Sequence, residues 1–153
     1  MIVRRFLLWC RSASPGQRAE AVASLARAYL YAELSADEKW EAETALTAML
    51  DDHSALVRRA MAEAFANATE APRHLVVSLA NDQSDIAALV LARSPLLADA
   101  DLVDCAALGD DLVQTAIAMR WTLSPGAAAA LAEIAGPEAV RALLDNPSAE
   151  IAP

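Results

Sequence analysis

Basic side chains are scarce in this chain of 153 residues. Twelve Lys and Arg residues stand against 21 Asp and Glu residues, so the formal net charge is −9 and the pI is near 4.6. Binding to nucleic acid relies on a basic face that neutralises phosphates, whereas the arginines here are scattered along the sequence. We therefore expect no nucleic-acid partner.

Cysteine and long apolar runs are also scarce. The two cysteines, Cys10 and Cys105, lie far apart and form no CxxC pair, so we expect buried free thiols in a reducing compartment. No segment approaches the roughly 20 apolar residues that span a membrane. The apolar run after Arg5 is too short for a signal peptide, and no small-residue cleavage site follows it. We expect a cytoplasmic chain without a membrane partner.

Alternating strand patterns are almost absent, and aromatic residues make up only 5% of the chain. Hydrophobic residues nevertheless reach 56%, mostly as alanine and aliphatic side chains. The four glycines and seven prolines fall mostly at the edges of helical segments. This composition predicts an all-α protein with one helical-repeat domain over residues 1–153.

The clearest helical signals lie between Asp52 and Pro95. Ser54 stands where a helix N-cap is expected, and Val57, Met61 and Phe65 recur at helical spacing after it. A turn at residues 70–72 precedes a second, shorter apolar stripe. A new start signal then follows at residues 81–84.

The start signals repeat along the chain. Val57, Ile86 and Val113 occupy like places after like starts, with spacings of 29 and 27 residues. A period near 30, with one helix pair in each unit, predicts an α-solenoid, an α–α superhelix of stacked hairpins. Another start signal at residues 146–148 leads us to expect that this sequence is the N-terminal part of a longer chain.

Asp52, Val57 and Arg58 resemble the pattern of a HEAT repeat. That resemblance implies a polar ladder in which the Asp and Arg residues of neighbouring repeats interact. Ala87 and Gln114 stand where Arg58 would recur, so we expect degenerate HEAT-like hairpins.

A closer resemblance, covering nearly the whole chain, is to an uncharacterised bacterial HEAT-like family known only as a domain of unknown function. It implies a helical-repeat fold and no established activity. The blocks that carry the resemblance are residues 27–31 (RAYLY), 57–63 (VRRAMAE), 71–72 (AP), 79–82 (LAND), 90–97 (VLARSPLL), 99–102 (DADL) and 116–118 (AIA).

Several groups of residues could in principle form a site. His53 beside Asp51 and Asp52 suggests a metal, but adjacent residues on a turn rarely supply three ligands, so we expect a solvated turn. Five aspartates lie at or near expected helix starts, where they cap helices. The three tryptophans could line a groove, but we expect them to fill the core. The aspartates are Asp99, Asp101, Asp104, Asp110 and Asp111, and the tryptophans are Trp9, Trp40 and Trp121.

The remaining candidates for interaction are Asp52, Arg58, Arg59, Arg73 and Arg93. They are expected either to form inter-repeat ladders or to meet an acidic partner segment. No catalytic motif, metal site or cofactor site is predicted, so we expect a non-enzymatic HEAT-like module for protein–protein interaction or regulatory scaffolding, with a protein or peptide partner. The alternatives are an enzyme on a HEAT-like scaffold, similar to DNA glycosylases, and the sensory or regulatory half of a larger signalling protein.

Overall fold

The structure is a computed structural model that describes residues 2–151. Within that range it forms ten helices and no strand; the only extended pairing there is a single parallel bridge between Leu123 and Ala149. The helices are α1 (Ile2–Cys10), α2 (Pro15–Tyr31), α3 (Ala36–Met49), α4 (Ala55–Phe65), α5 (Arg73–Ala80), α6 (Ser84–Leu91), α7 (Asp99–Leu108), α8 (Asp111–Ala118), α9 (Pro125–Ile134) and α10 (Pro137–Asp145).

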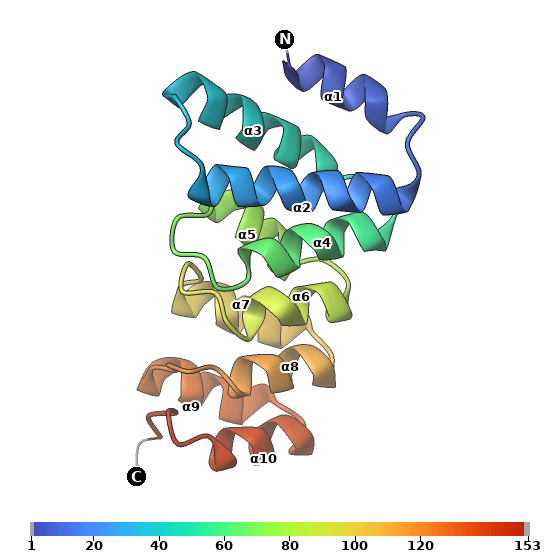
Figure 1. Ribbon diagram of the computed structural model, residues 1–153. Coiled ribbons are helices and arrows are strands. Elements are labelled where there is room, and N and C mark those ends of the chain that lie inside the picture. Colours follow the sequence, from blue (N-terminus) through green and yellow to red (C-terminus); the bar gives the residue numbers. More distant parts are fainter. Residues whose placement is uncertain (1, 152–153) are drawn as a thin grey trace.

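The helices form an elongated stack of two layers (Figure 1). In one layer the even-numbered helices lie side by side in chain order, from α2 through α4, α6 and α8 to α10. The odd-numbered helices lie on the other side, where α1 packs on α3 and α7 packs on α9. The prediction of an all-α, solenoid-like fold is therefore confirmed. None of the described helices has the length and apolar character needed to cross a membrane.

Four of the ten described helices begin at a polar side chain that accepts from a free backbone N–H group. Ser14 with Gln17 and Ser35 with Glu38 form capping boxes, while Asp110 and Ser124 cap α8 and α9. Ser54 is the N-cap residue of α4, as predicted, but its side chain makes no capping hydrogen bond. Its own backbone N–H donates to Oδ1 of Asp52 at 2.9 Å.

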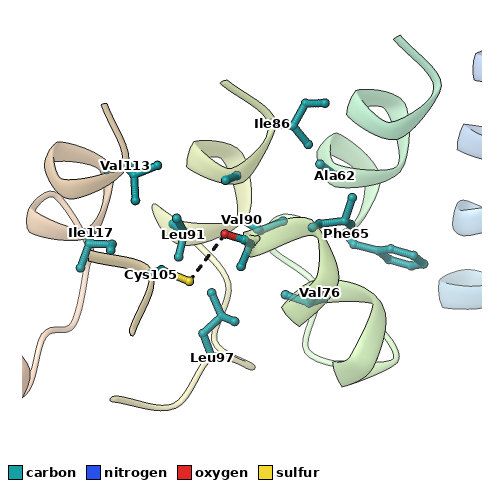
Figure 2. Packing of buried hydrophobic residues seen from close by; sticks show 14 of the residues in the cluster. Ala62, Phe65, Val76, Ile86, Val90, Leu91, Leu97, Cys105, Val113 and Ile117 are labelled. Atoms are coloured by element: carbon teal, nitrogen blue, oxygen red, sulfur yellow. Dashed lines mark hydrogen bonds between the residues drawn. The ribbon is translucent and has the colours of Figure 1, made fainter. Parts of the chain in front are cut away.

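The core follows the predicted repeat. Val57, Ile86 and Val113 are each the third residue of an even helix, and all three are buried. Ala139 holds the same position in α10 and is also buried. Figure 2 shows Ile86 and Val113 among the side chains of successive helices that meet in one continuous core. Because each hairpin covers its neighbour, one repeat alone would leave its apolar stripe in water.

The largest fully buried side chain is that of Phe65, on the helix where the sequence placed it. Its ring meets the ring of Tyr29 edge-on, with centroids 6.4 Å apart and planes at 87°. The prediction that the tryptophans fill the core was wrong, because Trp9, Trp40 and Trp121 are 42%, 59% and 85% exposed. Alanine-rich helices pack closely enough to close the core without these rings.

Candidate interaction surface

A polar ladder links the start of each even helix to the next repeat. Arg18, the fourth residue of α2, binds the carboxylate of Asp52 through Nε at 2.9 Å and Nη2 at 3.1 Å. Its Nη1 donates to the carbonyl of Ala13, just before its own helix, at 2.7 Å. Arg18 thus ties the α1–α2 loop to the α3–α4 loop.

Arg58 repeats this arrangement one hairpin later. It is the fourth residue of α4 and binds the carboxylate of Asp82 through Nε at 2.8 Å and Nη2 at 3.2 Å. Its Nη1 donates to the carbonyl of Asp52 at 2.6 Å. Asp52 therefore accepts from Arg18 with its side chain and from Arg58 with its main chain.

The ladder continues beyond α4 with neutral hydrogen-bond donors. Ala87 is the fourth residue of α6 and has no polar side chain, so Ser84 donates instead to Oδ2 of Asp110 at 2.7 Å. Gln114, the fourth residue of α8, accepts from the backbone N–H of Gly136 at 3.0 Å and donates to the carbonyl of Ala106 at 3.0 Å. The links between repeats persist after the guanidinium groups are lost.

These contacts set the protonation of two ladder carboxylates. Burial acts to raise the pKa of Asp52, but hydrogen bonds from Arg18 and from the backbone of Ser54 outweigh it, and the pKa lies below its usual value. The pKa of Asp110 is also lowered, first by the hydroxyl of Ser84 and then by the backbone N–H of Val113. Both side chains are therefore anionic at neutral pH.

The other predicted arginines lie in different surroundings. Arg59 pairs with Asp85 and joins α4 to α6, and both side chains are about two-fifths exposed. Arg73 donates to Asp101 at 2.5 Å and joins α5 to α7. Arg93 is exposed in the loop after α6. The five predicted residues thus form no single cluster, because only Asp52 and Arg58 meet directly.

Sequence reasoning missed a buried arginine, Arg120. It is only 6% exposed, and it donates to the carbonyls of Leu91 and Ser94 at 2.6 and 2.7 Å. Burial lowers its pKa, and the charge of Asp99 partly offsets that effect. The side chain fastens the loop between α6 and α7 beneath the α8–α9 loop. Nothing in the sequence around Arg120 signals this role, because both acceptors are main-chain atoms more than 25 residues away.

A groove runs along the edge of the stack where odd helices lead into even ones. One hollow of 550 Å³ lies between the α3–α4 and α5–α6 loops, and a second of 320 Å³ lies between the α5–α6 and α7–α8 loops. Asn81 and Asp82 line both hollows, so the two lie next to each other at the α5–α6 loop. We call this feature the loop-edge groove and define it by Leu50, Asp51, Asn81, Asp82, Leu108 and Asp110.

The groove lies where the charge of the chain changes. Residues 1–80 carry nine basic and ten acidic side chains, a net charge of −1, whereas residues 81–153 carry three basic and eleven acidic side chains, a net charge of −8. Arg58 is the only cation lining the two hollows, and Asp82 already pairs with it. Asp51 and Asp110 are both exposed and have no cationic partner among the ion pairs of the described residues.

The other candidate groups do not converge. His53 is exposed on the turn before α4, and no group of three His, Cys, Asp or Glu side chains suited to a metal occurs within residues 2–151. Asp101 caps the backbone N–H of Ala98, while Asp110 caps Val113. The capping role that was expected for these two aspartates is therefore confirmed.

The C-terminal part of the chain has recognisable relatives. Residues 86–153 match the model of a family described as "Uncharacterised protein conserved in bacteria (DUF2336)". The matched segment begins within α6 and covers less than half of the chain. It confirms the resemblance for the blocks from residue 90 onward, while the blocks at residues 27–82 lie outside it. Comparison with curated proteins and with solved structures finds no match.

Proposed function

We propose that this chain is a non-enzymatic, HEAT-like repeat module that binds a protein or peptide partner in the cytoplasm. The observation that carries the proposal is the loop-edge groove, which crosses three successive loops. Two adjoining open hollows suit an extended segment better than a compact small molecule. Stacked helical hairpins commonly supply such surfaces.

The ladder supports this proposal because it fixes the walls of the groove in advance. Asp82 lines the groove while holding Arg58, and Asp110 lines it while holding Ser84. Walls that are already ordered reduce the entropy lost on binding. The partner can therefore gain affinity from few contacts.

The charge and one exposed apolar side chain indicate the chemistry of the partner. Carboxylates at Asp51 and Asp110 attract a basic segment, and the net charge of −8 after Ala80 strengthens that attraction. Leu108 stands at the rim with 89% of its surface in water. An apolar side chain of the partner can cover it, since exposed apolar groups beside polar ones are typical of interaction sites.

The enzyme alternative has less support. A DNA-glycosylase-like reaction requires a basic face around a buried acid. Outside α1 and the turn after it, the exposed arginines without an acidic partner, Arg27, Arg93 and Arg141, lie on α2, in the α6–α7 loop and on α10. They offer no common basic face for a phosphate backbone.

The test uses the purified chain as bait, followed by affinity measurements on each captured protein. Leu108→Lys should weaken binding of a genuine partner by tenfold or more, because it removes the apolar contact and places a positive charge against a basic segment. Tyr31→Lys is the matched control, since Tyr31 is 80% exposed but lies at the opposite edge of the stack. Equal losses for both variants, or no saturable protein binding at all, would contradict the proposal.

A further inference from the structure

The first helix differs in charge from the rest of the protein. Residues 1–13 contain Arg4, Arg5 and Arg11 and no acidic residue, although the whole chain has a net charge of −9. Among the ion pairs of residues 2–151, none involves these three arginines. Their charge is therefore not neutralised within the fold.

The exposed side of α1 consists of two kinds of side chain only. Ile2, Leu8 and Trp9 are 70%, 50% and 42% exposed, and Arg4 and Arg5 are exposed between them. We call these five residues the α1 outer face. Such a mixture of large apolar side chains and arginine, without acids, is typical of helices that lie in the interface of a lipid bilayer.

The opposite side of α1 holds the helix on the stack. Val3 is buried, and Phe6, Leu7 and Cys10 are half-buried against the core. The thiol of Cys10 lies 3.9 Å from the sulfur of Met49, which places the end of α1 at the end of α3. The α1 outer face is thus presented by a packed helix and needs no unfolding to become accessible.

The position of α1 suits contact with a flat surface. It forms one end of the elongated stack and packs on α3, as Figure 1 shows. A protruding helix at the end of a stack meets a plane without a complementary groove, which a protein partner would have to supply. This geometry favours a membrane surface over a protein as the occupant.

The acidic residues of the chain do not cancel this attraction. The segment with a net charge of −8 lies toward the other end of the stack, several helices away (Figure 1). Neighbouring helices are about 8–10 Å apart, and the screening length at physiological salt is about 8 Å. Helix α3, on which α1 packs, carries Asp37, Glu38, Glu41 and Glu43, and none of these acids forms an ion pair with an arginine of α1 among the described residues.

We propose that the α1 outer face binds the surface of bilayers containing anionic phospholipids, with Trp9 and Leu8 at the headgroup level and Arg4 and Arg5 beside the phosphates. The expectation of no membrane partner was based on the lack of a spanning segment and of a signal peptide. Neither consideration concerns a peripheral contact made by one basic helix. The inference is independent of the loop-edge groove, because no residue of α1 lines it.

The test measures binding of the full chain to vesicles of phosphatidylcholine with and without phosphatidylglycerol. A background with Trp40→Phe and Trp121→Phe leaves Trp9 as the only fluorophore of its type. We expect saturable binding to the anionic vesicles only, a shift of Trp9 emission to shorter wavelength, and weakening by added salt. Equal binding to neutral vesicles, or no emission shift with anionic ones at low salt, would overturn the proposal.

A matched pair of double variants separates local from overall charge. Arg4→Gln with Arg5→Gln should lower the partition coefficient about 25-fold, at roughly fivefold for each arginine. Arg27→Gln with Arg141→Gln removes the same charge from two exposed sites away from α1 and should change binding less than about twofold. Equal losses in both pairs would refute a role for α1. Thermal unfolding of all variants checks that they remain folded. The comparison of anionic with neutral vesicles uses the chain with Arg4 and Arg5 intact, so it does not depend on these variants.

Discussion

Arg58 holds Asp82 through two parallel hydrogen bonds, Nε to Oδ2 at 2.8 Å and Nη2 to Oδ1 at 3.2 Å, and so joins two successive repeats. Both side chains are largely buried, with 16% and 14% exposure. The pair also shapes the loop-edge groove, since both residues line it. The structure of the groove and the stability of the stack therefore depend on the same contact.

Removing this contact should be costly, and a neighbouring arginine provides the control. Arg58→Ala leaves the carboxylate of Asp82 and the carbonyl of Asp52 without their donor, and we expect a loss of about 2 kcal/mol in the free energy of unfolding. Arg59→Ala removes a more exposed pair with Asp85 and should cost less than about 1 kcal/mol. Urea unfolding of both variants checks the difference. Equal midpoints would show that the ladder contributes nothing.

Phe65 should be the most sensitive core position on α4. Its ring is fully buried and meets Tyr29 edge-on, so Phe65→Ala leaves a cavity and should cost about 3–5 kcal/mol. Tyr31→Ala, at a side chain 80% exposed, should stay within about 0.5 kcal/mol. Chemical denaturation measures both values. A neutral result for Phe65→Ala would mean that the ring is not in the core.

Arg120 should control the order of the α6–α7 loop. Arg120→Met leaves the carbonyls of Leu91 and Ser94 unpaired and should destabilise the fold by about 3 kcal/mol. Amide hydrogen exchange across residues 92–98 should also become faster. Arg141→Met, on the exposed side of α10, should change neither quantity. Unchanged exchange in the Arg120 variant would contradict the anchoring role.

The pH dependence of stability should contain a contribution from Asp52. Its pKa in the folded state lies below the usual value, so its stabilising effect is complete above that value and is lost as pH falls through the folded pKa. We expect the free energy of unfolding to decrease as the pH falls below about 4. Asp52→Asn should be less stable at neutral pH and should flatten this slope. Asp104→Asn, at an exposed carboxyl, is the control; an unchanged slope in Asp52→Asn would be inconsistent with the ladder contact.

The fold could be predicted because its determinants are local. Capping residues such as Ser35 and Ser124 act within three positions of themselves, and the spacing of Val57, Ile86 and Val113 reflects one helix pair per unit. Each of these signals can be read from a short window. The stacked order of the helices then follows, since no single pair covers its own apolar stripe.

The surface could be predicted only in part, because its contacts join distant positions. Asp82, the partner of Arg58, lies 24 residues away in the sequence. The acceptors of Arg120 are backbone carbonyls, which every residue has, so residue types cannot identify them. The tryptophans were misassigned for a related reason. Trp40 on α3 and Trp121 in the α8–α9 loop lie where no neighbouring helix covers them, and only the packed structure determines which positions those are.

The most direct test of protein binding at the loop-edge groove is site-specific photo-crosslinking in living bacteria. A photoreactive residue is placed at Leu108, at the rim of the groove, or at Tyr31, which is also largely exposed but lies at the opposite edge. The account predicts a discrete crosslinked species at Leu108 that disappears when Asp51 and Asp110 are changed to Asn, and none at Tyr31. The same species at both positions, or one at Leu108 that survives the loss of both carboxylates, would contradict it.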